Sequence, residues 1–370
     1  MENTYHGLPI TIRGENPGPT WRHNNAAEKR ARRNWPKDYD HDILLTVETT
    51  DKCTLRCDHC FAESGPEKNT FIDHKKIEEI AKECETIFPQ YGQKIIRITG
   101  GDPFLHPKIF GIVKSFSKRK KKLGYKLLDV ETNGWWATDD ETARKYIKKL
   151  KASGADLLSM TNDYFHCKQG VFDIHEHMHR IDHIASEEGL RFRNILTGYG
   201  TDTPDENTAK EIEEHKKRCN HCHGIPNITP IGRARELPEE TWGSHVTCGL
   251  TGCRLTPPLF MPLIGAEKYT HRDEITLGPN GNVYPCNSGK EFEHASLAIG
   301  NIYRRPLAHI IQDPQNKIVD IIRKEGLRGV SKRAGITSPN HWGTYWKMSP
   351  CGLCHELLRT RGKQIQKNIK

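Results

Sequence analysis

The chain has 370 residues, of which 35% are hydrophobic and 28% are charged, and its formal net charge is +9. This length is sufficient for two domains or for one barrel with an appended domain. No apolar run approaches roughly 20 residues, and the N-terminus lacks a basic segment followed by an apolar one, so neither a membrane span nor a secretory signal is predicted. We therefore expect a cytoplasmic protein without membrane contact, and the positive charge indicates an anionic partner.

The first 40 residues are polar and basic and show no clean hydrophobic period, which predicts an arm with one short helix at 26–33. From residue 41, short apolar runs alternate with longer amphipathic segments, a pattern that predicts strand–helix units and a mainly parallel α/β sheet. The predicted strands are 43–48, 94–99, 126–131, 156–160, 191–196 and 225–230. The predicted helices are 73–88, 107–123, 139–153, 172–188 and 208–217.

The alternation stops after residue 235, and the remaining segment is rich in Gly, Pro and Cys, with one helix predicted at 306–325. We interpret residues 236–370 as a second domain that cysteines support. The chain contains 12 cysteines. Because cytosolic thiols are kept reduced, metal or cluster ligation is a better interpretation of this number than disulfide formation.

Three cysteines leave one short loop directly after the first predicted strand: Cys53, Cys57 and Cys60. Thiolates are the usual ligands of iron–sulfur clusters, and three of them leave one iron of a four-iron cluster open. A structural zinc site would require a fourth ligand, for which His59 is badly placed between two of the cysteines. The loop therefore favours a 4Fe–4S cluster over zinc.

This C-x3-C-x2-C motif resembles the radical S-adenosylmethionine (SAM) superfamily, whose members chelate SAM on the open iron by its amino and carboxylate groups. Segment 100–103 resembles the family's glycine-rich segment that receives the SAM amino group. Segment 131–134 lies where the family contacts the SAM sugar and carboxylate, and segment 228–234 resembles the one along the adenine. The implied cofactor-binding residues are Gly100, Gly101, Asp102, Pro103, Glu131, Asn133, Ile231 and Gly232.

The resemblance covers residues 43–235 and implies a partial (β/α)6 TIM-like barrel at 41–235, with catalytic groups at the carboxyl ends of the strands. One position departs from the family. An aromatic residue usually stands directly before the third cysteine, whereas this chain has His59 there and Phe61 after it.

Later cysteines resemble the auxiliary-cluster domains called SPASM and twitch, in which a glycine, four residues and a cysteine recur, as in Gly281 and Cys286. The segment from 278 to 286 predicts a hairpin that ends in a ligand. The resemblance implies one auxiliary 4Fe–4S cluster. Its predicted ligands are Cys286, Cys351, Cys354 and either Cys253 or Cys248. Cys219 and Cys222 could form, with Cys248, a zinc site or a second auxiliary cluster, or they could be two reduced thiols.

Polar residues follow the fourth predicted strand and should point into the mouth of the barrel: Asp163, Tyr164, His166 and Cys167. Asp163 or His166 could accept a proton from a substrate, because a carboxylate or an imidazole suits general-base catalysis. The alternative is a loop cap with a solvated histidine. Cys167 could donate a hydrogen atom to a carbon radical, with an inert buried thiol as the alternative.

The family resemblance also implies the reaction: a reduced cluster cleaves SAM, and the resulting 5′-deoxyadenosyl radical abstracts a hydrogen atom from substrate. Similar enzymes with auxiliary clusters modify ribosomally made peptides by crosslinks, thioethers or epimerisation, and the basic arm could hold an acidic leader peptide. We therefore expect a peptide substrate, and an electron donor such as flavodoxin or ferredoxin.

Two alternatives stay open. The first is a dehydrogenase or epimerase of a sugar, an aminoglycoside or another small molecule, because no winged-helix domain for a leader peptide is recognisable in the sequence. The second is a non-catalytic iron–sulfur or nucleic-acid-binding protein. It is disfavoured, because the basic residues are not interleaved with aromatic ones as they are in nucleic-acid grooves.

Overall fold

The computed structural model describes residues 4–5, 8–9, 42–195, 232–237, 272–286, 289, 291–336 and 350–369. Five parallel strands follow one another across the main sheet, and each pairs with the next. They are β3 (Asp42–Glu48), β4 (Lys94–Thr99), β5 (Leu127–Thr132), β6 (Leu157–Thr161) and β7 (Arg191–Ile195). All five were predicted from the sequence within about two residues at their starts.

Strand β8 (Arg272–Leu277) lies on the other side of β3 and pairs with it in parallel. This strand was not predicted from the sequence, and the predicted sixth strand, at 225–230, lies outside the described residues. Two short antiparallel strands, β9 (Asn282–Tyr284) and β12 (Gly300–Asn301), complete a sheet in the order β12-β9-β8-β3-β4-β5-β6-β7. The predicted hairpin after β8 is confirmed. The domain boundary at 235 stays a prediction.

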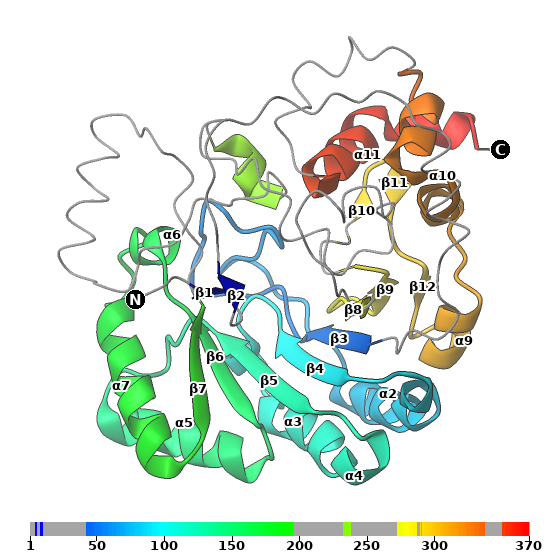
Figure 1. Ribbon diagram of the computed structural model, residues 1–370. Helices are drawn as coiled ribbons and strands as arrows, with labels where there is room; N and C mark the ends of the chain where they lie inside the picture. Colours follow the sequence, from blue (N-terminus) through cyan, green and yellow to red (C-terminus); the bar gives the residue numbers. More distant parts are fainter. Residues whose placement is uncertain are drawn as a thin grey trace.

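Helices cover one face of this sheet, as Figure 1 shows. They are α2 (His74–Ile87), α3 (Ile109–Ser117), α4 (Lys120–Leu123), α5 (Asp140–Ala152) and α7 (Ile174–Glu188). Side chains at alternate strand positions, such as Ile98, Val130 and Met160, are fully buried on the helix side. The residues between them, including Arg97, Asp129 and Ser159, face the opposite, concave side. This alternation makes one face a core and leaves the other face for chemistry.

Local sequence explains where these helices begin and end. Asp139 and Asp173 cap α5 and α7 by accepting backbone N–H groups, and Gly189 ends α7 in a left-handed conformation. The predicted helix at 107–123 is two helices, α3 and α4, with a break after Ser117. The result is the predicted α/β fold, a partial TIM-like barrel with its helices outside.

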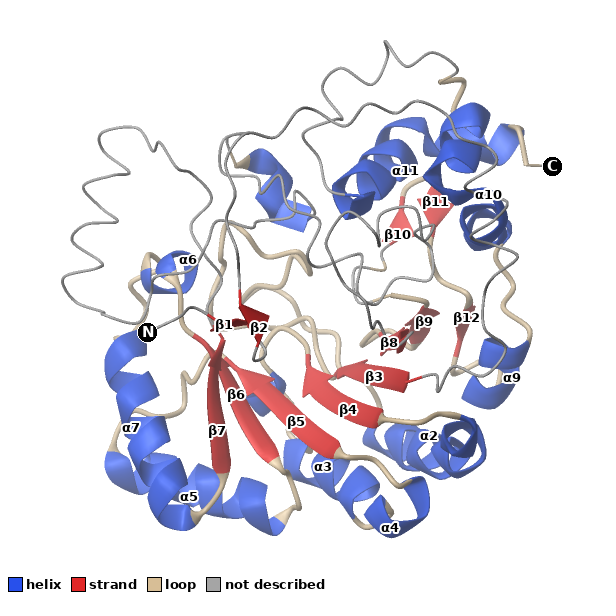
Figure 2. Cartoon of the chain, viewed as in Figure 1, coloured by secondary structure: helices blue, strands red, loops and turns tan. Residues whose placement is uncertain are grey.

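The carboxyl-terminal part carries three helices, α9 (Leu307–Gln312), α10 (Lys317–Arg333) and α11 (Pro350–Lys367). Helix α11 lies beside the hairpin of β10 (Glu291–Phe292) and β11 (Ala295–Ser296), whereas α9 lies near β12 (Figure 2). The predicted helix at 306–325 is thus two helices, and α11 was not predicted. Near the start of the chain, β1 (Thr4–Tyr5) pairs with β2 (Leu8–Pro9). None of the described helices is both long and apolar enough to span a bilayer.

Candidate functional site

The three predicted cluster ligands lie in the loop between β3 and α2, above the carboxyl end of the sheet. Cys53 and Cys57 are buried and Cys60 is half-buried. The sulfur of Cys53 accepts hydrogen bonds from the backbone N–H of Leu55 (3.4 Å) and from Nδ2 of Asn133 (3.5 Å). Burial raises the pKa of the Cys53 thiol, with the carboxylate of Asp102 acting in the same direction. A metal must therefore displace the proton, as cluster iron does.

The segment after β4 packs backbone to backbone against this loop. Gly101 donates its N–H to the carbonyl of Thr50 (2.6 Å), and Asp102 donates its N–H to the carbonyl of Lys52 (2.8 Å). A Cβ on Gly101 would overlap that Lys52 carbonyl, and Gly100 adopts φ +142°. Both glycines are thus required by the approach of two backbones, and they bring Pro103 and Asp102 beneath the cysteine loop.

Asp102 is fully buried and accepts three hydrogen bonds. Its Oδ1 accepts the backbone N–H of Phe104 (2.9 Å), while Oδ2 accepts the hydroxyl of Thr132 (2.7 Å) and the backbone N–H of Asn133 (2.9 Å). Burial raises the pKa of Asp102 to about 6, although these donors lower it. This carboxylate thus joins the end of β4 to the end of β5. Its predicted contact with SAM stays a prediction.

A second set of contacts to the cysteine loop comes from the short 3-10 helix η3 (Gly232–Glu236). The guanidinium of Arg233 donates to the carbonyls of Cys57 (2.9 Å) and Ser64 (2.7 Å), and its backbone N–H donates to the carbonyl of Cys60 (3.1 Å). Segment 228–234 was predicted to lie along the adenine, but no role was predicted for Arg233. Its neighbour Gly232 is described, whereas Ile231 lies outside the described residues.

Of the residues predicted at the barrel mouth, Asp163 and His166 face the cluster loop. Nδ1 of His166 lies 2.8 Å from Oδ1 of Asp163, and Nε2 of His59 lies 3.6 Å from Oδ2. The ligand atoms of His59 and His166 also lie within 4.8 Å of the Cys57 sulfur. Cys167 turns toward α7 instead, where its sulfur lies 3.3 Å from Nε2 of His175.

Burial and mutual contacts shift the pKa values of Asp163, His166 and His59. Burial alone would raise the pKa of Asp163, but the imidazoles of His166 and His59 lower it. Burial alone would lower the pKa of His166, but the Asp163 carboxylate and Cys57 raise it well above its usual value. Burial lowers the pKa of His59 to about 4. Asp163 therefore lies buried between two imidazoles, of which the His166 ring is the nearer.

Comparison with known proteins identifies two domains in the chain. The radical SAM superfamily matches residues 47–191, and the SPASM family, an iron–sulfur cluster-binding domain, matches residues 269–334. The chain carries a radical SAM domain and a SPASM domain. The C-x3-C-x2-C loop lies within the first match and Cys286 within the second. A radical SAM domain holds a 4Fe–4S cluster and binds SAM, and a SPASM domain binds iron–sulfur clusters, so 4Fe–4S clusters and SAM are the cofactors of this protein.

The relatives are similar over part of their length only. A GTP 3′,8-cyclase from Peptoclostridium acidaminophilum is 31% identical over 32% of this chain and 34% of its own length. The antilisterial bacteriocin subtilosin biosynthesis protein AlbA from Bacillus subtilis is 28% identical over 40% of this chain and 32% of its own length. The solved structure of anSMEcpe with bound AdoMet and the Cp18Cys peptide is 13% identical, covers 89% of this chain and 95% of that chain, and has a TM-score of 0.48. The chain thus spans about a third of the curated relatives.

The radical SAM domain fits a three-thiolate cluster. The three sulfurs come from one loop, donors already point at one of them, and glycines at positions 100, 101 and 232 let neighbouring backbones close around the loop. The donor set matches iron–sulfur chemistry. Among the described residues, Cys57, His59 and His166 also place their ligand atoms within 4.8 Å of one another, so a single metal ion is a competitor for Cys57.

Charged side chains on the concave face of the sheet form a group that the sequence analysis largely missed. Glu131 pairs with Arg97 (2.8 Å), and Asp129 pairs with Arg193 (2.8 Å) and with the hydroxyl of Ser159 (2.7 Å). Burial raises the pKa of Glu131, although Arg97 opposes this. Only Glu131 was predicted, because the cations that pair with it, Arg97 and Arg193, lie on two other strands, β4 and β7. The alternation of apolar and charged residues along β4, β5 and β7 is the signal that could have indicated the group.

Of the predicted auxiliary ligands, Cys286 follows the β8–β9 hairpin within the SPASM match, while Cys351 and Cys354 lie after that match, in the first turn of α11. Cys286 and Cys354 are buried and Cys351 is half-buried. Cys248 and Cys253, one of which was predicted as the fourth ligand, lie outside the described residues, as do Cys219 and Cys222. The auxiliary ligand set therefore stays a prediction.

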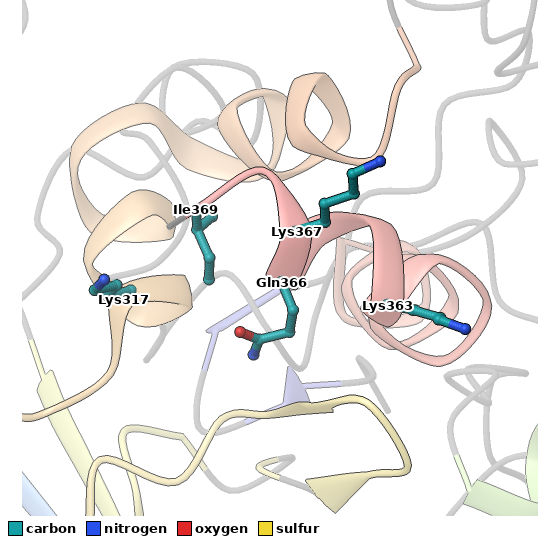
Figure 3. Close-up of a pocket in the computed structure, with 5 residues that line it drawn as sticks. All are labelled: Lys317, Lys363, Gln366, Lys367 and Ile369. Carbon is teal, nitrogen blue, oxygen red and sulfur yellow. The ribbon is translucent and has the colours of Figure 1, made fainter.

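A shallow depression of about 290 Å³ at the end of α11 is lined by Lys317, Lys363, Gln366, Lys367 and Ile369 (Figure 3). In Figure 3 the amino groups of Lys317, Lys363 and Lys367 lie well apart, so the lysines do not converge on one ligand. The depression contains none of the predicted site residues, and we assign it no function.

Two glycines of similar backbone conformation provide a test of the contacts that η3 makes with the cysteine loop. Gly232 (φ +58°) and Gly170 (φ +64°) share a left-handed conformation, but a Cβ on Gly232 would lie 2.6 Å from the Cys60 carbonyl, whereas one on Gly170 would meet nothing within 4 Å. We expect Gly232→Ala to lose at least half of the iron after reconstitution, and Gly170→Ala to keep it with a stability loss of about 1 kcal/mol. Iron analysis and thermal unfolding measure both. Equal iron contents in the two variants would show that the contacts of η3 do not hold the cysteine loop.

Proposed function

We propose that the chain is a radical SAM enzyme that modifies a ribosomally made peptide. The observation that carries the radical reaction is the three-cysteine loop, held from two sides by the glycine segment at 100–101 and by Arg233, within a radical SAM domain. When bound, the cluster and SAM supply a radical that abstracts a hydrogen atom from an unactivated carbon.

Residues of the chain hold the cluster and position the loop that carries its ligands. Cys53, Cys57 and Cys60 hold the cluster, and Asn133 and Leu55 donate hydrogen bonds to the Cys53 sulfur. The contact of Arg233 with the carbonyls of Cys57 and Ser64 fixes the path of the loop. We propose that Cys286, Cys351 and Cys354, with a fourth cysteine, hold one auxiliary cluster, and that a flavodoxin or a ferredoxin supplies electrons.

Peptide as the substrate class is supported by the similarity to AlbA, a bacteriocin biosynthesis protein, over 40% of the chain. The similarity to GTP 3′,8-cyclases supports a small-molecule substrate as the second candidate. Asp163 is only 1% exposed and faces His59 and His166, so we propose that it orients His166 and does not itself contact substrate. Cys167 remains the proposed hydrogen-atom donor.

The reaction is tested anaerobically with the full chain after iron–sulfur reconstitution. With SAM and dithionite we expect 5′-deoxyadenosine, and we expect its rate to rise when a short precursor peptide encoded beside this gene is added. A rise with nucleoside triphosphates or amino sugars, and none with the peptide, would favour the second candidate. A fully loaded protein that forms no deoxyadenosine with any of these would contradict the proposal.

A further inference from the structure

Three side chains at the cysteine loop bring possible metal ligands together: Cys57, His59 and His166. Their ligand atoms all lie within 4.8 Å of one another. Cys57 is buried, and the side chains of His59 and His166 are only 13% and 14% exposed. A thiolate with imidazoles is a ligand set that suits zinc and similar divalent transition metals. The group therefore has the residue types and the closeness that a single metal ion requires.

Asp163 orients both histidines. Its Oδ1 lies 2.8 Å from Nδ1 of His166, and the same oxygen accepts the backbone N–H of His166 at 3.1 Å. Its Oδ2 lies 3.6 Å from Nε2 of His59. Each imidazole thus turns one nitrogen toward the carboxylate, which leaves Nε2 of His166 and Nδ1 of His59 for a metal ion. A carboxylate behind a ligating histidine is the usual arrangement at metal sites.

The Nδ1 atom of His59 is an independent indication of a ligand. It is buried and has no hydrogen-bond partner, which is unfavourable for a polar atom inside a protein. The ring is held in place, because it packs against Phe165 with centroids 4.6 Å apart and meets His166 edge-on at 5.1 Å. A metal ion bound together with Cys57 would give this nitrogen a partner.

We propose that the chain, before its cluster is inserted, binds one divalent transition metal ion such as zinc through Cys57, His59 and His166. Asp163 is the positioning residue, a water completes four-coordination, and binding displaces the proton of the Cys57 thiol. The ion joins α6 (Tyr164–Cys167) to the cysteine loop. It also competes with cluster assembly, a consequence that rests on the proposed function, in which the Cys57 sulfur is a cluster ligand.

Cobalt(II) is the probe, because its absorption reports thiolate coordination. The full chain is freed of iron, reduced and titrated anaerobically with cobalt chloride, and bound cobalt is counted after gel filtration. Cys57→Ala removes the thiolate, and His59→Phe removes one nitrogen ligand but keeps a ring that can pack on Phe165. We expect each variant to bind about one cobalt fewer than the wild type. His183→Gln on α7 is the control, since that exposed side chain should not affect binding.

Two further variants distinguish this site from one made by the three cysteines of the loop. Cys53→Ala removes a proposed cluster ligand but none of the single ion, so it should bind as much cobalt as the wild type. Asp163→Asn should weaken cobalt binding by about 10-fold to 100-fold. Equal cobalt in the wild type and His59→Phe would overturn the site. So would loss of one cobalt from a Cys53→Ala chain whose circular dichroism is that of the wild type.

Competition with the cluster is measured by adding zinc before reconstitution. Zinc should slow iron uptake in the wild type and leave the uptake of His59→Phe unchanged, and an equal effect on both would overturn the competition. Deoxyadenosine formation is assayed separately, after reconstitution without zinc. A chain that binds cobalt as expected but forms no deoxyadenosine would contradict the proposed function and leave the metal site standing.

Discussion

Replacing Cys53, Cys57 and Cys60 together by alanine is expected to abolish 5′-deoxyadenosine formation and to lower the iron content from roughly eight to about four atoms per chain. The reason is that all three protein ligands of the proposed cluster come from this loop, so no partial coordination remains. The remaining iron would belong to the auxiliary cluster. Iron and sulfide analysis, with chromatographic detection of deoxyadenosine, measures both changes on the same samples.

Cys84→Ala is the matched control for this variant. Cys84 lies on α2, is fully buried in the hydrophobic core, and belongs to neither group of proposed ligands. We expect it to keep its iron and its SAM cleavage while losing about 1 kcal/mol of stability, the typical cost of a core truncation. If the triple alanine variant keeps the iron content of the wild type, the cluster is held elsewhere and the assignment of the loop is wrong.

The elements that the sequence predicted well are those with a local signal. The strands from β3 to β7 are apolar runs followed by helices, and the caps of α5 and α7 are visible in the sequence as Asp139 and Asp173. The break between α9 and α10 was missed, although Pro314 and the helix cap at Asn316 mark it. Local patterns are therefore enough for most elements, provided that turn residues are given weight.

The position of strand β8 could not be predicted from local sequence patterns. Its sequence follows a long segment without regular alternation, and its place beside β3 is decided by pairing across more than 200 residues of chain. For the same reason, the site was predicted in part only. The cysteines stand in one motif, whereas Arg233 reaches Cys57 from a distant segment, and Arg193 meets Asp129 from another strand. Such contacts exist only once the chain has folded.

Asp102→Ala is expected to destabilise the protein by about 3 kcal/mol at neutral pH, because it leaves three donors without their acceptor. These are the backbone N–H groups of Phe104 and Asn133 and the hydroxyl of Thr132. The change also releases Asn133, whose side chain contacts the Cys53 sulfur, so we expect poorer iron retention. Asp140→Ala is the control, since that carboxylate is 75% exposed and pairs only at the surface with Arg180.

The pH dependence of this difference distinguishes loss of Asp102 from a general loss of packing. Burial raises the pKa of Asp102 from 3.8 to about 6. Between these values the folded chain keeps a proton that the unfolded chain has released, so the free energy of unfolding of the wild type falls as pH rises from about 4 to about 6. Asp102→Ala lacks this group. Denaturant unfolding of both metal-free chains should therefore show their stability difference growing as pH is lowered through this window, whereas a constant difference would show that the Asp102 carboxylate is ionised throughout.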